Sequence, residues 1–539
     1  MTDILEKIKQ SDKKLFVGLA GPGTGKSFTF GTIIKSEEYK GKKILILSFI
    51  NKLIDDLSEE FNDFPNVDVS TLHAFARSIL VKEEDCDLDE DLDKYISEDY
   101  SFIHGSKINY EKKFHDNDLT DNEKEFYKQR KEFYSSNGKL YSFNSVVYAA
   151  NLLFQQNESK IPTYDLILVD EFQDFNKSEY ELIKFLNKQS TVILVGDDDQ
   201  SLYHFKQAKP SQIRSLYNDG DTEGFSLDYC YRCPKVIIET TNDLIRNAKT
   251  NGCLDERLEK EFLYPEGHKD EESKKYAQIT FVPSVIGNQL AYRLSKMIEE
   301  DLEEYKDKQR VLILTPSYLK QTVYEGLMKK GFTVVGVELF SNEERNKIKH
   351  RKLCEVFEIL LKRKTDNLAL RKILPLYLDE TKRKEVINES NEKQKKIWNC
   401  LDDGIKGKIE EDINIFKKVK TGKKELSKTE LERFSKIFNL KNILTKIVRG
   451  FESNKKDAIE VELTTVTSSK GLSADFVYYV GIDDEHILDK DTKKFTDHKI
   501  CEFLVGITRA KKKLTLISLK DASPKILNLV GKEKILKKN

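Results

Sequence analysis

The stretch from Leu15 to Ser27 constrains the fold of this chain more than any other. An apolar run of β-prone residues ends at Leu19, a glycine-rich turn follows, and Lys26-Ser27 leads into residues that favour a helix. Glycines allow the backbone to wrap closely around an anion, and the N-terminus of the next helix directs positive charge at it. The order of strand, glycine-rich turn and helix therefore predicts a phosphate-binding loop, in preference to a turn with a chance Lys-Ser pair.

In a loop of this kind, an ammonium group reaches the β- and γ-phosphates of a nucleotide and a hydroxyl group binds Mg²⁺. We expect Lys26 and Ser27 to have these two roles. Ala20 stands where the first glycine of the general motif is usual. The other residues expected around the phosphates are Gly21, Gly23, Thr24 and Gly25.

Composition limits the alternatives. The chain has 539 residues, which predicts several domains, and its 91 Lys and Arg nearly cancel its 92 Asp and Glu. Nucleic-acid binding therefore needs a local basic groove, because the chain has no overall basic excess. Seven scattered cysteines include one CxxC pair without a second pair, so we expect ordinary thiols, no zinc site, and a reducing cytoplasmic location. No apolar run approaches the length of a membrane span.

In the first part of the chain, short apolar stretches that predict strands alternate with stretches that predict helices, and a longer helical segment interrupts this pattern. Strands are predicted at 43–48, 67–69, 165–169 and 191–195, and this alternation predicts a parallel sheet in an α/β fold. Polar and aromatic clusters follow each strand, and the carboxyl ends of parallel strands lie at one edge of the sheet. We therefore expect these clusters to lie on the same edge as Lys26.

A second α/β unit begins near Phe225, with strands predicted at 279–282, 310–314, 332–337, 461–466, 476–480 and 514–519. We expect a first core at 1–80 and 160–224 with a mostly helical insertion at 81–159. We expect a second core at 225–374 and 458–539 with a small helical insertion at 375–457. Within this insertion, Ser427 and Glu430 are predicted to form a capping box.

Acidic residues at the end of an apolar strand suggest a site. Asp170 follows one strand and is expected to hold Mg²⁺, while Glu171 is expected to orient or deprotonate the attacking water. Gln200 follows the neighbouring strand, where its amide can sense the γ-phosphate. Phosphoryl transfer also uses cations from another domain, and the candidates are Arg232 and Arg509, although a single arginine is more often a surface or salt-bridged residue.

Aromatic side chains past the strand ends are candidates for stacking on unpaired bases, and polar neighbours can hold a nucleic-acid backbone. For any one aromatic residue, packing in the core is the more common role. The aromatic candidates are Phe49, Phe75, Tyr203 and Phe205, and the backbone-binding candidates are Asn51, His73 and Lys206.

Taken in order, these motifs resemble those of UvrD/Rep-type superfamily 1 helicases. The resemblance runs from residue 20 to about 519 and is most specific in Asp170-Glu171-Phe172-Gln173-Asp174 and Gly196-Asp197-Asp198-Asp199-Gln200-Ser201. It implies two RecA-like cores with ATP and Mg²⁺ between them, single-stranded DNA across their top, and movement from 3′ to 5′. It also implies that Tyr231 lies against the adenine and that Gly471, in Ser468-Ser469-Lys470-Gly471-Leu472, lies at the nucleotide.

Two functions remain open on this basis. The first is a DNA-dependent ATPase that translocates on single strands and unwinds duplexes. The second is a regulatory subunit in which ATP binding switches a DNA-sensing surface that recruits a partner, such as a nuclease in repair or antiviral defence. The near-complete set of catalytic residues favours the first.

Overall fold

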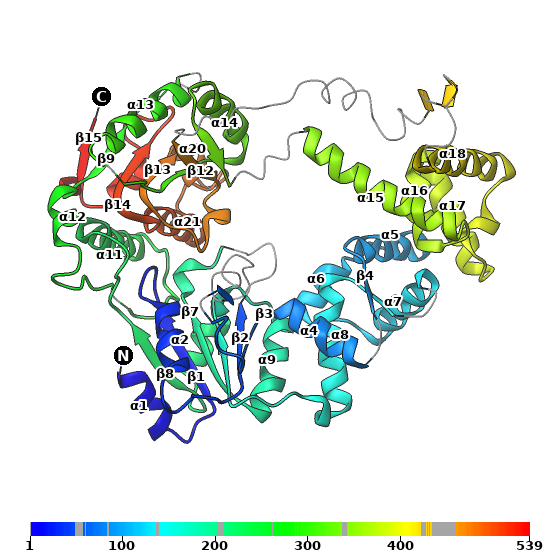
Figure 1. Ribbon diagram of the computed structural model, residues 1–539, viewed down its shortest axis with the longest axis horizontal. Helices are drawn as coiled ribbons and strands as arrows, with labels where there is room; N and C mark the ends of the chain where they lie inside the picture. Colours follow the sequence, from blue (N-terminus) through cyan, green and yellow to red (C-terminus); the bar gives the residue numbers. More distant parts are fainter. Residues whose placement is uncertain are drawn as a thin grey trace. The chain divides into compact units, whose positions relative to one another are not determined.

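The computed structural model describes residues 2–48, 58–59, 61–83, 86–135, 139–202, 210–260, 262–285, 287, 289–305, 307–336, 342–421, 427, 429–430, 432–433 and 459–538. The chain forms two compact units. The first contains Met1–Phe75, Asn151–Glu338 and Lys456–Asn539, and the second contains Ala76–Ala150 and Leu339–Lys455. Figure 1 shows the elements of both units in their sequence colours.

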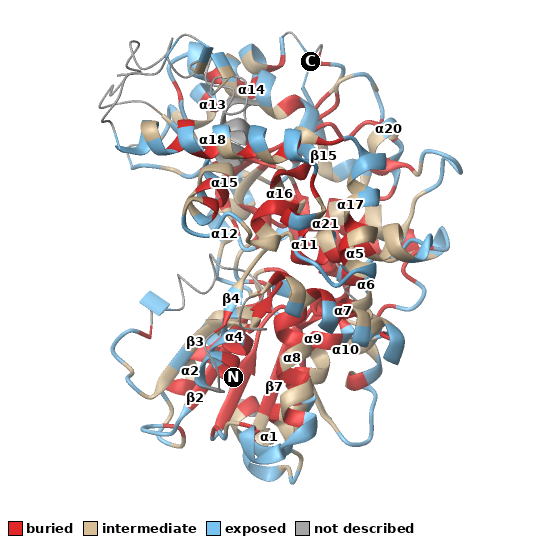
Figure 2. Cartoon of the chain, turned by 90° about the vertical axis from the view of Figure 1, so that its right-hand side faces the viewer, coloured by how far each residue is buried: buried red, intermediate tan, exposed pale blue. Residues whose placement is uncertain are grey.

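The N-terminal half of the first unit is built on a six-stranded sheet in which every described pairing is parallel. Its strand order is β3-β2-β6-β7-β1-β8. The strands are β1 (Leu15–Ala20), β2 (Ile44–Ser48), β3 (Val67–Thr71), β6 (Leu166–Val169), β7 (Thr191–Gly196) and β8 (Glu223–Leu227). Apart from the first residue of β1 and of β7, every residue of the four central strands is buried, and Figure 2 shows this burial for β7. Continuous apolar strands of this kind are typical of a sheet covered on both faces.

Helices precede or connect these parallel strands, since parallel neighbours need crossover connections. They are α1 (Thr2–Gln10), α2 (Lys26–Ile34), α4 (Leu72–Glu83), α8 (Phe143–Gln156), α9 (Lys177–Gln189) and α10 (Pro210–Tyr217). Phe30 and Ile33 of α2 pack into one core with Phe16 of β1 and Ile46 of β2. This packing fixes the position of the loop between β1 and α2.

The C-terminal half of the first unit contains a seven-stranded parallel sheet, with the order β11-β12-β10-β13-β14-β9-β15. The strands are β9 (Ile279–Val282), β10 (Val311–Leu314), β11 (Thr333–Val335), β12 (Glu460–Thr464), β13 (Ala474–Val480), β14 (Ala510–Ile517) and β15 (Ile535–Lys537). The accompanying helices are α11 (Lys235–Thr250), α12 (Asp270–Lys275), α13 (Leu290–Leu302), α14 (Lys320–Lys329), α20 (Asp484–Ile487) and α21 (Asp497–Ile507).

The structure confirms the predicted α/β fold class with parallel sheets, and it differs from the sequence analysis at two strands. We expected the second core to begin near Phe225, but β8 pairs with β1 in the first sheet. This pairing is close, because a Cβ on Gly18 would lie 2.4 Å from Phe225 Cζ. Strand β15, which pairs with β9, was not expected.

The second unit is mostly helical and has one hydrophobic core of its own. Its helices are α5 (Leu92–His104), α6 (Tyr110–Asp116), α7 (Asp121–Tyr134), α15 (Asn342–Lys362), α16 (Asn367–Tyr377), α17 (Glu380–Glu392) and α18 (Asp403–Thr421), with a short parallel pair of strands, β4 (Asp87–Leu88) and β5 (Leu140–Tyr141). Helices α15 and α16 were expected in the second core, with the insertion beginning at 375. They lie in this unit instead, because Phe357 and Leu370 are buried in its core.

The capping box predicted at Ser427 is present. The Ser427 backbone N–H donates to Glu430 Oε2 at 2.9 Å, and the Glu430 N–H donates to Ser427 Oγ at 3.2 Å. Across the part of the chain that the structure describes, no helix combines the length and apolar character needed to cross a bilayer.

Candidate nucleotide site

The glycine-rich turn joins β1 to α2 in the way that the sequence predicts. Gly23 and Gly25 have φ angles of 73° and 86°, in the left-handed region that favours glycine. The Thr24 hydroxyl donates to Gly21 O at 2.9 Å, and the Lys26 ammonium donates to Ala20 O at 3.4 Å. The turn is thus closed by its own contacts and leaves the N-terminus of α2 open toward a ligand.

The segment that follows β8 packs directly on this turn. Tyr231 N–H donates to Gly23 O at 2.9 Å, and Cys230 Sγ lies 3.1 Å from Pro22 O. A Cβ on Gly23 would lie only 2.4 Å from Arg232 Cβ. Gly23 is therefore needed for its backbone angle and also because the Arg232 side chain begins beside it.

Asp170 and Glu171 follow β6 directly and lead into the 3₁₀ turn Phe172–Asp174. Asp170 Oδ1 accepts the N–H of Glu171 at 2.8 Å. Glu171 Oε1 lies 3.2 Å from the Lys26 ammonium. Glu171 also has a φ of 53°, which is uncommon for a residue with a side chain and directs its carboxylate to this position.

Burial and neighbouring charges give the two carboxyl groups different proton affinities. Burial and the charge of Glu171 raise the pKa of Asp170. Burial also disfavours the charged form of Glu171, but Lys26, Lys470 and a hydrogen bond from Gln173 outweigh it and lower its pKa. Glu171 is thus held as a carboxylate, the form that can accept a proton.

Gln200, Arg232 and Arg509 meet beside these carboxylates. Arg509 Nη2 donates to Gln200 Oε1 at 3.2 Å, and Arg509 Nε donates to Val505 O at 2.9 Å. Burial and the nearby charge of Arg232 lower the pKa of Arg509 to about 9. Two neighbouring cations that repel one another in this way, one buried and one half-buried, favour an anion between them.

One cavity of about 540 Å³ joins these groups, and it lies within the first unit. A cavity of this size is in the range of ligand pockets, which is about 300–1,000 Å³. Its lining contains all six predicted catalytic residues and all of the predicted nucleotide-binding residues except Ala20. These lining residues are Gly21, Gly23, Thr24, Gly25, Lys26, Ser27, Asp170, Glu171, Gln200, Tyr231, Arg232, Gly471 and Arg509. Ala20 is buried and contributes its carbonyl oxygen to Lys26.

The cavity also contains residues that the sequence analysis did not single out. Lys269 and Lys511 line it, and Lys269 donates to Lys511 O at 2.9 Å. Lys511 could have been proposed from the sequence, because it lies two residues after Arg509, at the start of β14. Phe28, in the first turn of α2, also lines the cavity and is 63% exposed. Lys470 forms an ion pair with Asp174, so the second half of the unit contacts the turn after β6.

Two of the seven predicted DNA-binding residues lie in the part of the chain that the structure describes. Phe75 is 6% exposed and packs against the Tyr164 ring at 6.5 Å between centroids, so it belongs to the core and does not present a free face for stacking. His73 Nε2 lies 3.6 Å from Glu179 Oε1. The remaining candidates lie outside the described residues, namely Phe49, Asn51, Tyr203, Phe205 and Lys206.

Comparison with known proteins gives two family matches. The family described as "AAA domain" matches residues 5–206, and the family described as "Viral superfamily 1 RNA helicase core domain" matches residues 142–284. Both matches include the Asp170–Gln200 region.

Several curated proteins are similar to parts of the chain. "ATP-dependent DNA helicase Rep" of Buchnera aphidicola subsp. Schizaphis graminum is 26% identical over 438 residues, which cover 68% of this chain and 63% of that protein. "Probable DNA helicase II homolog" of Mycoplasma capricolum is 25% identical over 280 residues, or 43% of this chain and 39% of that protein. "ATP-dependent DNA helicase PcrA" of Staphylococcus aureus is 33% identical over 140 residues, or 22% of this chain and 19% of that protein.

The chain thus spans less than two thirds of the length of these relatives. The matches agree with the ordered motifs, with the two parallel sheets that carry them, and with the cavity at which the motifs meet. Together they show that the chain is similar to DNA helicases of the Rep, DNA helicase II and PcrA type, and they support its resemblance to UvrD/Rep-type superfamily 1 helicases.

Proposed function

We propose that this chain hydrolyses ATP and uses the energy to move along single-stranded DNA from 3′ to 5′ and to separate duplex strands. The observation that carries the proposal is the 540 Å³ cavity in which Lys26 and Glu171 face Arg232 and Arg509. The first two residues come from the N-terminal half of the unit and the other two from the segments after β8 and α21. Movement of one half relative to the other would therefore change the charge around a bound phosphate.

Each side chain has a distinct role in this proposal. Lys26 neutralises the β- and γ-phosphates, and Arg232 and Arg509 stabilise the charge that develops on the transferred phosphoryl group. Gln200 reports the presence of the γ-phosphate to Arg509, with which it shares a hydrogen bond. Glu171 takes the proton from the attacking water, because its pKa is lowered and it stays ionised.

The residues at the cavity also fit Mg²⁺. Asp170 supplies a buried carboxylate and Ser27 a hydroxyl, and both line the same cavity. Oxygen ligands of this kind are those that Mg²⁺ prefers. When bound, the ion supplies positive charge to the β- and γ-phosphate oxygens.

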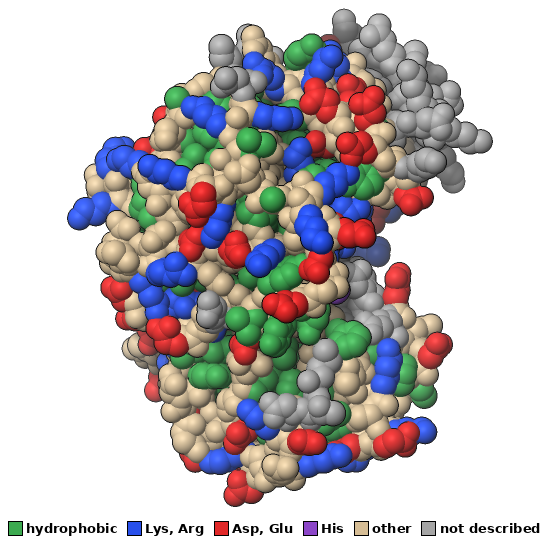
Figure 3. Space-filling model, turned by 90° about the vertical axis from the view of Figure 1, so that its left-hand side faces the viewer, with side chains coloured by type: hydrophobic (Ala, Val, Ile, Leu, Met, Phe, Trp, Pro, Cys, Tyr) green, Lys and Arg blue, Asp and Glu red, His purple; other side chains and the backbone are tan. Residues whose placement is uncertain are grey.

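A second cavity of about 500 Å³ supports the nucleic-acid part of the proposal. It lies at the carboxyl ends of β10, β12 and β13. Tyr318 at its rim is 60% exposed, and its hydroxyl lies 2.8 Å from His486 Nε2. An exposed ring beside polar groups suits stacking on an unpaired base. Elsewhere on the surface, Lys and Arg side chains are interspersed with Asp and Glu, as on the face drawn in Figure 3.

The test is ATP hydrolysis by the purified chain, measured alone, with single-stranded DNA and with single-stranded RNA. The proposal expects stimulation by DNA of at least tenfold, and displacement of a labelled strand from a duplex with a 3′ tail but not from one with a 5′ tail. Tyr318→Ala should weaken the stimulation, whereas Tyr292→Ala, at a ring that is 49% exposed on α13, should not. ATP binding with negligible turnover would support the regulatory subunit instead.

A further inference from the structure

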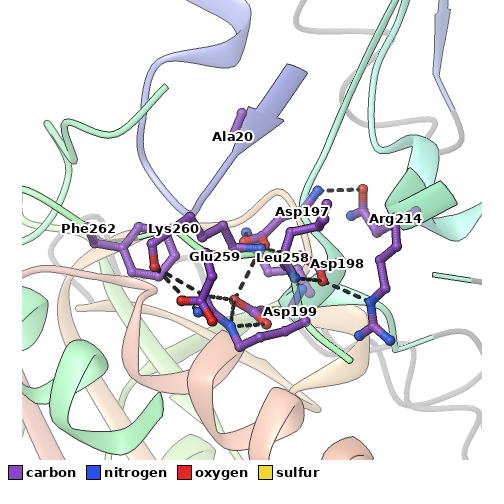
Figure 4. A network of polar contacts seen from close by, with 12 residues as sticks. Ala20, Asp197, Asp198, Asp199, Arg214, Leu258, Glu259, Lys260 and Phe262 are labelled. Atoms are coloured by element: carbon purple, nitrogen blue, oxygen red, sulfur yellow. Dashed lines mark hydrogen bonds and ion pairs between the residues drawn. The ribbon is translucent and has the colours of Figure 1, made fainter. Parts of the chain in front are cut away.

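A buried cluster of charges lies beside the candidate nucleotide site (Figure 4). Three successive carboxylates follow β7, and their residues are at most 2% exposed. Three cations face them. The carboxylates are Asp197, Asp198 and Asp199, and the cations are Arg214, Arg257 and Lys260.

The Lys260 ammonium lies at the centre of the cluster. It is 2.6 Å from Asp197 Oδ1 and 3.2 Å from Asp199 Oδ2, and it also pairs with Asp198. The three carboxylates offer oxygens within 4.8 Å of one another, which is close enough to hold a metal ion. The ammonium group occupies that position, so the cluster is an ion-pair network.

Arginines complete the pairing. Arg257 donates from Nε to Asp199 Oδ1 at 3.0 Å and from Nη2 to Asp199 Oδ2 at 2.7 Å, a two-pronged contact that fixes the carboxylate plane. Arg214 Nε donates to Asp198 Oδ2 at 2.9 Å. Each carboxylate therefore has a cationic partner, as buried charges require.

Asp197 connects this network to the nucleotide site in two directions. Its Oδ2 accepts the Gln200 side-chain amide at 2.7 Å, and Gln200 in turn contacts Arg509. Its backbone N–H donates to Gln173 Oε1 at 3.0 Å, and Gln173 Nε2 donates to Glu171 Oε2 at 2.5 Å. A shift of Asp197 would thus move the residue that reports the γ-phosphate and the residue that accepts the proton.

The segment that carries Arg257 and Lys260 also contacts the phosphate-binding turn. A Cβ on Gly21 would lie 1.7 Å from Phe262 Cε1, so the ring packs directly against that glycine. Phe262 is anchored in turn to α11, because its carbonyl oxygen accepts the Asn242 side-chain amide at 2.8 Å and its N–H donates to Asn242 Oδ1 at 3.2 Å. One short segment therefore joins α11 to both the turn after β1 and the turn after β7.

We propose that Lys260, supported by Arg257, is a positioning residue that holds Asp197 and Gln200 so that the γ-phosphate is sensed and α11 receives the signal. The inference rests on the proposed function, and it adds a route by which nucleotide state reaches the C-terminal half. Lys260 acts through Asp197 and Gln200 and is not required to touch the nucleotide.

A double-mutant cycle tests this route through nucleotide binding as well as turnover. The variants are Lys260→Met, Gln200→Ala and their combination, with Lys275→Met as control because that side chain is 45% exposed and its ammonium pairs with Glu304 at 2.5 Å. The measured quantity is the ratio of affinities for a non-hydrolysable ATP analogue and for ADP. Each single change should reduce this ratio by about tenfold, the size of one charge-assisted hydrogen bond.

The combination should reduce the ratio no further than Gln200→Ala does alone, because Lys260 acts through Gln200. Additive losses would show a general structural role and would overturn the inference. In steady-state turnover, Lys260→Met should lower kcat while the KM for ATP changes less than threefold. If Lys260→Met does not fold, Lys260→Arg carries the same cycle, since it keeps the charge and changes the reach.

The affinity ratio separates this inference from the proposed function. A wild-type chain without DNA-stimulated turnover would defeat the proposed function, while the cycle would still be measured on binding. A wild-type chain that turns over normally but shows an unchanged affinity ratio in Lys260→Met would defeat the inference alone.

Discussion

The Nη2 atom of Arg509 lies 3.2 Å from Oε1 of Gln200, although the two residues are 309 positions apart in the sequence. Arg509 follows α21 in the C-terminal half, and Gln200 belongs to the turn after β7 in the N-terminal half. This hydrogen bond joins the two sheets at the cavity. Arg232, the other arginine in the cavity, has no carboxylate partner among the described contacts. A bound phosphate would balance its charge.

Arg509→Lys should therefore lower turnover while ATP still binds. An arginine at the transferred phosphoryl group contributes about 10³–10⁵-fold in related phosphoryl-transfer sites, and lysine cannot reproduce its planar set of donors. We expect a loss of at least about 10²-fold in kcat, measured by phosphate release. Arg310→Lys is the matched control, because that side chain is 55% exposed and its guanidinium pairs with Glu462 at 3.7 Å. Equal activity in the two variants would contradict the role of Arg509.

Glu171→Gln and Lys26→Ala should separate chemistry from binding. The amide keeps the shape of the Glu171 side chain but cannot accept a proton, so turnover should fall about 10²–10⁴-fold with ATP still bound. Lys26→Ala removes the positive charge that would neutralise the phosphates, so it should abolish both turnover and tight ATP binding. Binding is measured with a fluorescent ATP analogue. Normal hydrolysis by Glu171→Gln would refute its assignment as the proton acceptor.

The phosphate-binding turn offers a steric test with an internal control. Gly23→Ala combines a φ of 73° with a Cβ that would lie 2.4 Å from Arg232 Cβ, whereas Gly41→Ala has a φ of 76° and no atom within 4 Å. Both changes cost the left-handed strain of about 1–2 kcal/mol in the free energy of unfolding. Only Gly23→Ala should also displace Arg232 and weaken ATP binding by at least tenfold. Similar ATP affinities in the two variants would show that the close approach has no functional consequence.

Apart from Ala20, the residues predicted for the nucleotide site line one cavity, and they could be grouped from the sequence because they follow local rules. Glycines before Lys26 and acids after an apolar strand are readable without tertiary information, and the parallel sheet then brings them to one edge. The boundaries of the inserted segments were harder to predict. Amphipathic helices within residues 342–377 could pack against the second α/β core or in the helical unit. Only the buried positions of Phe357 and Leu370 show which core they join.

The ion-pair network could not be predicted, because its partners are far apart in the sequence. Lys260 pairs with acids about sixty positions earlier, and a lone Arg-x-x-Lys spacing carries no signal of burial. Phe75 shows a different limit of sequence-based prediction, because its position fits two roles. An aromatic residue past a strand end fits both base stacking and core packing, and the burial of the Phe75 side chain shows that it packs in the core.

The pH dependence of stability should reveal the pairing of Asp199. Burial disfavours its charged form, but Lys260 and Arg257 outweigh this and lower its pKa to about 2. Its contribution is therefore present above the ordinary pKa of 3.8 and is lost as the pH falls through 2. In Arg257→Met the carboxylate stays buried with one cation fewer, so its pKa should be higher than in the wild type, and the difference in stability between the two chains should shrink as the pH falls through this raised value.

The predicted loss of unfolding free energy in Arg257→Met is about 3–5 kcal/mol at pH 8 and becomes smaller at pH 4, as measured by urea unfolding. Arg246→Met is the control, since that side chain is 69% exposed and pairs with Asp243 one turn away on α11. Its effect should be below about 1 kcal/mol and should not change with pH. A loss in Arg257→Met that is the same at both pH values would show that Asp199 is not the group responsible.

The helical unit contains a second buried network, which joins its two sequence segments. Asp99 of α5 accepts Arg130 Nε of α7 and Arg371 Nε of α16, each at 3.0 Å. Arg371→Met removes the only one of these partners that comes from the later segment and leaves Asp99 with one arginine. We expect a loss of about 3 kcal/mol, the lower end of the range for breaking a buried pair, because Arg130 remains.

Arg351→Met on α15 is the control, since its side chain is 81% exposed and its partner Glu355 is 3.5 Å away. In differential scanning calorimetry, the helical unit should unfold at a lower temperature in Arg371→Met than in the wild type. Arg351→Met should leave the unfolding temperature unchanged. Because the nucleotide cavity lies in the other unit, ATP-analogue binding should be unchanged below that transition, and a parallel loss of binding would show that the two units do not unfold separately.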